Sequence, residues 1–286
     1  MSRNRSTVVQ GSPTVLVTGA GRGLGHVAAV RLAASGWQVY AGVRNAADAQ
    51  RMAEKPNVTS VIVDVTNEEH LAKLPSQLPE RLDALVSNAG VAVGGPIETL
   101  TLDDLRWQLD VNVIGAVGVT QAVLPLIRKA HGRIVFISST SGRVATPSLG
   151  AYGASKFALE AIGDSLRNEL RPWGITVSLI EPGPIISRFR ENCLPHFERH
   201  IDWRSSVHRS SYEGQLARLR HPGPAAPFTL GPEAVVARLL DALENPYPKA
   251  RYPVTTPAVA FAWLKRFLST ALMDRVLRRA SGGGKR

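Results

Sequence analysis

Short apolar runs alternate with longer amphipathic segments over the first 180 residues of the chain. The runs at 14–18, 38–42, 58–63, 82–86, 132–137 and 175–180 predict strands. The segments 24–35, 46–54, 68–77, 102–129 and 152–171 carry apolar residues at helical spacing. Near-continuous apolar strands that alternate with helices are typical of a parallel sheet covered on both faces. The pattern therefore predicts an α/β, doubly wound sheet whose ligands bind at the carboxyl ends of the strands.

This alternation stops after residue 180. Residues 188–228 combine histidine, tryptophan, arginine and proline without a clean period, and we expect an irregular insertion that serves as a substrate lid. A helix is predicted over 232–244, a short strand near 251–254, and an amphipathic segment over 258–279. We therefore expect one catalytic domain over 13–256, which contains the lid, and a basic amphipathic C-terminal helix with a tail over 257–286.

The composition is that of a folded protein. The chain of 286 residues is 44% hydrophobic and 20% charged, which excludes disordered and collagen-like classes. Its one cysteine, Cys193, excludes an internal disulfide and a zinc site built on several thiolates. The N-terminus shows no apolar signal-peptide stretch, and the longest apolar stretch near the C-terminus is too short for a bilayer. We therefore expect a cytoplasmic protein.

The net charge of +11 is concentrated in the C-terminal third. Residues 1–187 hold 17 basic and 15 acidic side chains, a net of +2, whereas residues 188–286 hold 17 and 8, a net of +9. Nucleic acid is the least favoured partner, because no reading motif accompanies the charge. The segment from 259 to Arg279 combines Trp, Phe and Leu with a basic face, as interfacial helices do. Two readings stay open, a helix packed on its own domain or a dimer mate, and peripheral contact with an anionic membrane.

Glycines at 19, 21, 23 and 25 follow the first predicted strand, in Thr18-Gly-Ala-Gly-Arg-Gly-Leu-Gly25. Glycine permits a tight turn and lets backbone amides approach a pyrophosphate at a helix N-terminus, where the dipole favours negative charge. The spacing differs from the commoner G-x-G-x-x-G, and a glycine-rich turn without a ligand is the alternative. Its place between a strand and a helix favours a dinucleotide site.

The residues after the second strand favour NADP(H) over NAD(H). A free ribose 2′-hydroxyl usually meets an acidic residue about 20 residues past the glycines. This chain has Val43 and Arg44 there, and Arg22 within the glycine turn. Two arginines suit a 2′-phosphate, which a guanidinium binds with two hydrogen bonds, although they are alternatively solvated surface residues. After the third strand, Asp64 either accepts from an adenine amino group or caps the next helix.

Tyr152 and Lys156 form a candidate acid–base pair. Residues four apart share one face of a helix. A lysine cation beside a phenol favours the phenolate and lowers a pKa that is otherwise about 10, which makes tyrosine a usable acid or base near neutrality. Ser138 and Ser139 end the fifth strand, and Ser139 lies thirteen residues upstream of Tyr152. A serine hydroxyl there can bind a substrate oxygen from the same end of the sheet.

Together these motifs resemble the short-chain dehydrogenase/reductase superfamily. They are TGAGRGLG, SNAG at 87–90, Asn112 in DVNVIG, ISSTSG at 137–142, YGASK at 152–156 and EPGPIIS at 181–187, in the order and spacing of the family. The resemblance implies a Rossmann fold and an enzyme that acts on CH–OH groups. The reaction implied is reversible hydride transfer between a nicotinamide and the carbonyl or alcohol carbon of a substrate.

The resemblance also implies roles for single residues. Tyr152 is the acid/base, Lys156 binds the nicotinamide ribose and lowers the tyrosine pKa, Ser139 orients the carbonyl oxygen, and Asn112 holds a water that links the lysine to solvent. Asn88 stabilises the sheet beside the cofactor, and Ser187 stands where threonine is usual. The cofactor residues implied are Gly19, Gly21, Arg22, Gly23, Leu24, Gly25, Arg44, Asp64, Val65, Asn88, Ala89, Gly90, Tyr152, Lys156, Pro182, Gly183, Ile185 and Ser187.

Within the superfamily, VYAGVR, YGASKFALEAIGDSLRNEL and the RYPV strand are similar to retinol, 17β-hydroxysteroid and 3-hydroxybutyrate dehydrogenases. This similarity implies a lipophilic steroid-, retinoid- or long-chain-like alcohol or ketone, and a homodimer or tetramer. Candidate pocket walls in the insertion are Phe189, Leu194, Phe197, Trp203, Tyr212 and Leu216, which alternatively pack the lid onto the core. No metal site is expected, because His196, His200 and His208 have no nearby carboxylate support beyond Glu198.

The rival hypothesis is a protein without useful catalysis. It is a regulator that senses NADP(H) or a lipid, or a membrane-surface binding protein, on the same scaffold. The presence of Ser139, Tyr152, Lys156 and Asn112 argues against it, because a sensor has no need of all four.

Overall fold

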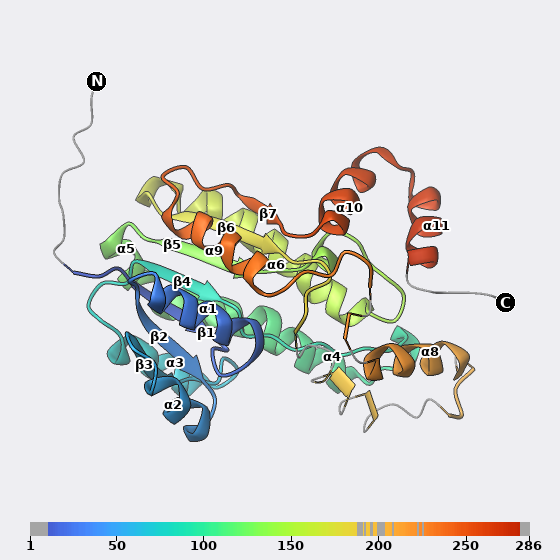
Figure 1. The fold of residues 1–286 in the computed structure, drawn as a ribbon, viewed down its shortest axis with the longest axis horizontal. Helices are drawn as coiled ribbons and strands as arrows, with labels where there is room; N and C mark the ends of the chain where they lie inside the picture. The colour runs from blue at the N-terminus through green and yellow to red at the C-terminus, as the bar shows by residue number, and fades with distance from the viewer. Residues whose placement is uncertain are drawn as a thin grey trace.

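The computed structural model describes residues 11–187 and 226–280 and, between them, 191, 193–194, 197–198, 204–207, 209–221 and 223–224. Within these residues, seven parallel strands form one sheet in the order β3-β2-β1-β4-β5-β6-β7 (Figure 1). The strands are β1 Thr14–Thr18, β2 Gln38–Val43, β3 Val58–Ile62, β4 Ala84–Ser87, β5 Arg133–Ile137, β6 Thr176–Glu181 and β7 Arg251–Pro253. The predicted doubly wound sheet is confirmed, and its order reverses between β1 and β4.

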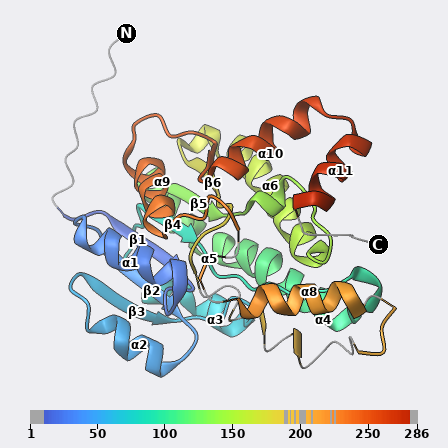
Figure 2. The same ribbon diagram turned by 45° about the vertical axis from the view of Figure 1, so that its right-hand side comes forward.

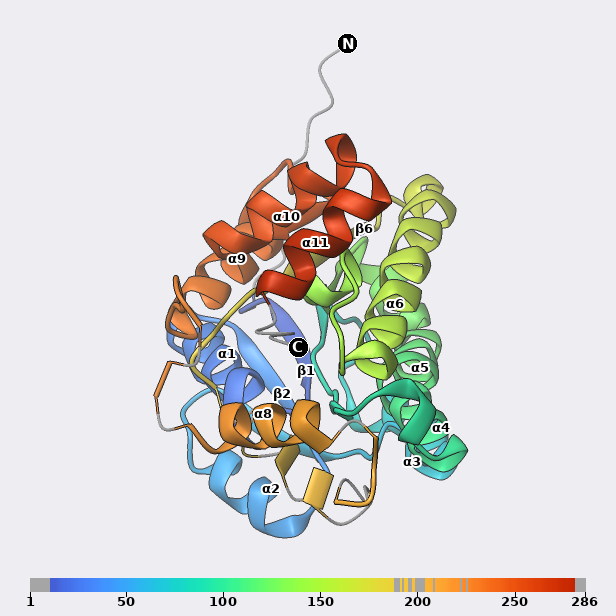
Figure 3. The same cartoon turned by 90° about the vertical axis from the view of Figure 1, so that its right-hand side faces the viewer.

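Helices cover both faces of this sheet, as Figure 3 shows. One face carries α1 Gly23–Ala34, α2 Ala46–Ala53 and α9 Glu233–Glu244, and the other carries α3 Glu68–Lys73, α5 Gly115–Ala130 and α6 Gly150–Glu169. In β1, Val15 and Val17 pack toward α1, whereas Leu16 packs toward α5, because successive side chains of a strand point to opposite faces. This double burial explains why the strands read as unbroken apolar runs.

The helix predicted over 102–129 is interrupted. It begins as α4 Leu102–Leu109, continues as a π-helical turn over Asp110–Ile114 and becomes α5. Thr101 and Asp104 form a capping box at its start. Among the described residues, Leu102–Ala130 is the one helix whose length and composition would suit a membrane span, but 56% of its most apolar window is buried. Its apolar character therefore reflects its place in the core.

The insertion is more ordered than predicted. An α-helix, α8 Arg209–Arg220, lies inside the segment that we expected to be irregular, beside α4 (Figure 2). Tyr212 and Leu216 of α8 are buried in one cluster with Val93, Leu100 and Leu105. The helix forms because its apolar side chains have this surface to cover. Short 3₁₀ segments lie at Leu74–Gln77, Ile97–Thr99, Thr140–Gly142 and Arg171–Trp173.

The predicted single C-terminal helix is two helices, α10 Thr256–Phe267 and α11 Thr270–Ala280. Leu268 has an extended backbone and ends α10. The chain then turns, so that Met273 and Leu277 of α11 are buried with Val144, and Leu264 of α10 packs on the same cluster. The break lets both helices cover one apolar surface of their own domain, which one straight helix could not reach.

Candidate active site

The glycine-rich turn joins β1 to α1 as predicted. Gly19 and Gly23 have φ of 67° and 58°, a region that favours glycine. A Cβ on Gly25 would collide with the Asn88 side chain, whose amide donates to Thr18 O at 2.9 Å. The first turn of α1 has no side-chain cap and no acidic residue, so its backbone N–H groups suit an anionic group. The turn therefore fits the pyrophosphate of a dinucleotide.

Thr18 connects this turn to the end of β4. Its hydroxyl accepts hydrogen bonds from the backbone N–H groups of Asn88 and Ala89, both at 3.0 Å. Gly90 follows beside the Asn112 side chain, and Leu24 packs against the core from α1. The structure thus brings the SNAG segment alongside the glycine-rich turn.

A group of arginines lies where α2 approaches the turn. Arg22 Nε is 3.7 Å from Asp48 Oδ1, and Arg51 pairs with the same carboxylate and donates to Gly21 O at 2.7 Å. Burial raises the pKa of Asp48, but hydrogen bonds from Arg51 and Asn45 outweigh burial and hold the pKa below its usual value. Sequence reasoning missed Asp48 and Arg51. Their i,i+3 spacing on a helix next to the turn was the available signal.

Asp64 lies in the segment after β3, near Arg44. Its Oδ1 accepts from Thr66 N at 3.0 Å and from Thr66 Oγ1 at 2.7 Å. Burial raises the pKa of Asp64, but these hydrogen bonds and the charge of Arg44 lower it overall. The cap of α3 is Asn67, so the helix-cap alternative for Asp64 is wrong. Val65 is buried against Gly115.

Tyr152, Lys156 and Ser139 meet at the start of α6. Tyr152 is 9% exposed, and the Ser139 hydroxyl hydrogen-bonds its phenol. Lys156 Nζ is 5.8 Å from the centroid of the Tyr152 ring and donates to Ile137 O at 2.8 Å. The structure therefore assembles the three predicted side chains at the carboxyl end of β5.

Burial has the largest effect on the pKa values of Tyr152 and Lys156. It raises the pKa of Tyr152 to about 12, against the effect of the Ser139 hydrogen bond. It lowers the pKa of Lys156 to about 8, against the effect of the Glu160 charge. The net direction for the pKa of Tyr152 is upward, because loss of water disfavours the phenolate. The lowering by Lys156 that the family resemblance implies stays a prediction.

Asn112 lies in the π-helical turn, and its amide is engaged on both sides. Nδ2 donates to Val91 O at 2.9 Å and to Ser155 Oγ at 3.0 Å, and Oδ1 accepts from Val91 N at 2.8 Å. Asn112 thus ties the segment after β4 to α6 beside Lys156. The water that the family resemblance assigns to it stays a prediction.

The segment after β6 closes the site from the opposite side. Pro182 O accepts from Thr140 N at 2.9 Å and from Thr140 Oγ1 at 3.1 Å, which joins it to the Ser139 loop. A Cβ on Gly183 would collide with Thr255 Oγ1. Ile185 pairs with Leu230 and packs on the core, and Ser187 is half-buried beyond it. Pro182 and Gly183 therefore lie at the site, and the chain then leads into the insertion.

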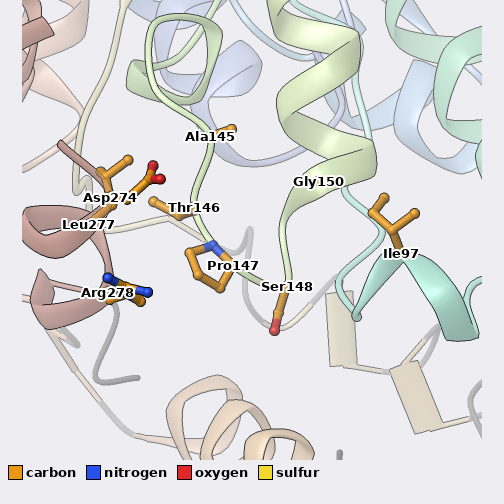
Figure 4. Close-up of a pocket in the computed structure, with 9 residues that line it drawn as sticks. All are labelled: Ile97, Ala145, Thr146, Pro147, Ser148, Gly150, Asp274, Leu277 and Arg278. Carbon is orange, nitrogen blue, oxygen red and sulfur yellow. The ribbon is translucent and has the colours of Figure 1, made fainter. Parts of the chain in front are cut away.

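A cavity of about 460 Å³ opens between α11 and the loop that enters α6 (Figure 4). Gly150, two residues before Tyr152, is part of its wall, and α11 contributes Leu277 across from it. The remaining lining residues are Ile97, Ala145, Thr146, Pro147, Ser148, Asp274 and Arg278. Sequence reasoning did not place the C-terminal segment here, because the break at Leu268 depends on packing.

Part of the insertion covers the site. Cys193 is buried with Tyr152 and Ala92 in an apolar cluster. Of the candidate pocket walls, Phe197, Tyr212 and Leu216 are buried and pack the insertion onto the core, with Leu194 against them. Phe189, Trp203, His196, His200 and His208 lie outside the described residues. The described residues contain no group of three metal-ligating side chains.

Sequence reasoning also missed a buried ionic cluster behind the site. Glu160 of α6 and Glu181 of β6 are 6% and 2% exposed. Arg251 of β7 contacts both, with Nε 3.1 Å from Glu160 Oε2 and 3.4 Å from Glu181 Oε1. Arg143 Nε is 3.0 Å from Glu181 Oε1, and Arg251 Nη2 is 2.5 Å from Asp164 Oδ2. The sequence feature that could have indicated this cluster is Glu160, an acidic residue four positions after Lys156.

Known proteins share this architecture. Residues 13–196 match the short chain dehydrogenase family. The chain is 38% identical to the uncharacterized oxidoreductase YbbO of Escherichia coli, over 92% of this chain and 93% of YbbO. It is 35% identical to human 17-beta-hydroxysteroid dehydrogenase type 1, over 84% and 77%, and 39% identical to mouse retinol dehydrogenase 5, over 63% and 59%.

Solved structures of other proteins have the same fold. A short-chain dehydrogenase from Burkholderia cenocepacia in complex with NADP is similar with a TM-score of 0.74 and 26% identity, over 93% of this chain and 98% of that one. A short chain dehydrogenase/reductase from Burkholderia phymatum in complex with NAD has the same fold, with a TM-score of 0.74 and 22% identity, over 89% of this chain and 92% of that one.

The fold and the site together define an oxidoreductase that uses a nicotinamide dinucleotide and acts on CH–OH groups. The chain belongs to the short-chain dehydrogenase/reductase family, in the neighbourhood of the retinol and 17β-hydroxysteroid dehydrogenases.

Proposed function

We propose that this protein transfers a hydride between NADP(H) and a lipophilic alcohol/ketone pair, with Tyr152 as acid/base. The observation that carries the proposal is the contact between Ser139 and Tyr152 beside buried Lys156, at the carboxyl ends of β4, β5 and β6. When bound, the nicotinamide supplies the hydride chemistry. The Tyr152 hydroxyl then gives a proton to the substrate oxygen or takes one from it, while the Ser139 hydroxyl orients that oxygen.

Lys156 supports this proton transfer by its charge. Its ammonium lies 5.8 Å from the centroid of the Tyr152 ring and donates a hydrogen bond to Ile137 O. Burial keeps the tyrosine protonated, and we expect a cation at this place to favour the phenolate. We expect the same ammonium to bind the nicotinamide ribose, and Asn112 to carry the water that connects Lys156 to solvent.

The preference for NADP(H) rests on the arginines near the glycine turn. Arg44 is exposed and makes no ion pair within the described residues, and Arg22 is held only loosely by Asp48. Such cations suit a 2′-phosphate. Asp64 keeps one carboxylate oxygen for an adenine amino group, with Val65 beside it.

The lipophilic substrate class rests on the surroundings of Tyr152. Ala92 and Cys193 pack against the tyrosine, and Ile97, Pro147 and Leu277 line the nearby cavity. Relatives named for retinol and 17β-hydroxysteroids support this class. We expect the distal part of the substrate to occupy the cavity under α11.

Replacement of Tyr152 by phenylalanine tests the proposal. With a ketone of the retinoid, steroid or long-chain class, Tyr152→Phe should lower kcat at least about 100-fold, because the proton donor is lost. NADPH binding, followed by fluorescence, should be retained. Tyr247→Phe is the control, because Tyr247 is 89% exposed. If Tyr152→Phe keeps more than about a tenth of the activity, the assigned role is wrong. If the wild type binds NADPH but turns over no such ketone, the rival hypothesis of a non-catalytic NADP(H)-sensing regulator is favoured.

A second candidate activity, binding at an anionic membrane surface, is favoured by one exposed feature. Trp263 and Phe267 of α10 are 60% and 72% exposed and stack with their ring centroids 6.0 Å apart. Arg266 is exposed next to Phe267 and suits acidic headgroups, whereas the Lys265 ammonium lies over the Phe157 ring of α6, 4.4 Å from its centroid. A second copy of the chain is a weaker occupant, because it would present the same positive charge. We propose a cytoplasmic dimer or tetramer that contacts the membrane peripherally.

A further inference from the structure

Glu160 lies one helical turn beyond Lys156, on the same face of α6 and in the interior of the protein. A carboxylate is expensive to bury unless a cation compensates its charge. The cations available to it therefore decide how much negative charge acts on its surroundings.

Those cations are shared. Arg251 serves Glu160, Glu181 and Asp164 at once, and Arg143 serves Glu181. Arg167 pairs with Asp164 at the exposed edge. Three arginines, Arg143, Arg167 and Arg251, thus face the three carboxylates of the cluster. Within the described residues, Glu160 pairs with Arg251 alone, and Arg251 is shared with Glu181 and Asp164.

Glu160 is the carboxylate of this cluster with the fewest cationic partners in the described residues. Its Oε1 is buried and has no hydrogen-bond partner within the described residues, and the same is true of Ser138 Oγ. Both side chains border Gly142, because a Cβ built there would lie 3.0 Å from Glu160 Cγ, from Ser138 Oγ and from Lys156 O. A carboxylate with one unpaired oxygen in the described residues therefore adjoins the backbone of Lys156.

Lys156 is a buried cation, which a nearby negative charge would stabilise. It is buried, its ammonium donates to a neutral carbonyl, and burial lowers its pKa to about 8 while the charge of Glu160 raises it. The other charged groups around Glu160 are Asp164 on α6, Glu181 on β6, Arg251 on β7 and Arg143, with Lys265 of α10 near Arg143.

We propose that Glu160 is a positioning residue that keeps Lys156 protonated and thereby sets the upper pH limit of catalysis. This inference rests on the proposed function for its catalytic consequence, but the charge coupling itself does not. Glu160 touches neither substrate nor cofactor and acts through the lysine alone.

The coupling is measured in the purified protein without substrate, by a double-mutant cycle of E160Q and K156M. At pH 7, E160Q should lower Tm by about 2 °C or more beyond its effect in the K156M background, because only the wild-type lysine loses an attraction. Near pH 10, where Lys156 is neutral, this difference should vanish. E169Q is the control, because Glu169 is an exposed carboxylate at the far end of α6 and has no ion pair with Arg251 within the described residues, and it should show no coupling to K156M. A coupling that is zero at pH 7, or equal at both pH values, overturns the inference.

The pH profile of ketone reduction gives the functional readout. E160Q should move the alkaline limb of kcat/KM to lower pH by about half a unit or more, because loss of the carboxylate lets Lys156 lose its proton earlier. E160D should restore most of this shift. An equal loss at every pH would mean a structural role and would contradict the inference. If the wild type reduces no ketone, the proposed function fails, while the Tm cycle still decides the coupling.

Discussion

Arg44 and Arg22 lie at one end of the glycine-rich turn but differ in how much of their charge is available. Arg22 is 3.7 Å from the carboxylate of Asp48, which Arg51 also engages. Arg44 makes no hydrogen bond or ion pair within the described residues and acts on Asp64 only through its field. Arg44 is therefore the better candidate to discriminate a 2′-phosphate from a hydroxyl.

We expect Arg44→Ala to weaken NADPH binding about 10- to 100-fold, the range for loss of a charge-assisted hydrogen bond, and to leave NADH binding within about threefold. Fluorescence titration with each dinucleotide measures both. Arg106→Ala, which removes an exposed arginine of α4, is the control. A wild type that prefers NADH, or an Arg44→Ala variant that weakens both cofactors equally, would rule out this role.

At the scale of elements, the sequence predicted what depends on neighbouring residues in the chain. β1 matches its prediction at 14–18, and α6 begins two residues before its predicted start. The same holds for Ser139, Tyr152 and Lys156, whose motifs carry their own spacing. The π-helical turn at Asn112, the break at Leu268 and the pairing of Glu160 with Arg251 were not predictable, because each is decided by surfaces distant in the sequence.

The exposed aromatic side chains of α10 lead to a prediction about membrane binding. Trp263→Ala combined with Phe267→Ala should reduce sedimentation with phosphatidylserine vesicles at least about fivefold, because the apolar anchor is lost. Added salt should weaken binding of the wild type, since the basic side chains are exposed. Trp173→Ala, an exposed tryptophan beside Arg128, is the control. If phosphatidylcholine vesicles bind equally well, or if the double variant binds like the wild type, α10 is not a membrane anchor.

At the scale of the whole molecule, Cys193 reports whether the insertion and the core unfold together. It is the one cysteine of the chain, it is 5% exposed, and burial raises its pKa to about 12. The thiolate is the reactive form, so at pH 8 a disulfide reagent should react more than about 100-fold slower with the native protein than with the unfolded chain.

In a urea titration, the thiol should become reactive at the same denaturant concentration at which tryptophan fluorescence changes, because Cys193 packs on Tyr152. Cys193→Ser supplies the blank. Reaction at clearly lower urea would show that the insertion opens by itself, contrary to this prediction.

The position of Arg251 has a consequence for biosynthesis. A ribosome delivers the catalytic residues by position 156, yet Arg251, the cation that pairs with buried Glu160, arrives with β7, about a hundred residues later. During that interval α6 carries an acidic side chain that has no Arg251 to meet, so its final packing must wait. A nascent or truncated chain that stops before residue 251 thus contains all the proposed catalytic residues and still lacks the cation that pairs with Glu160.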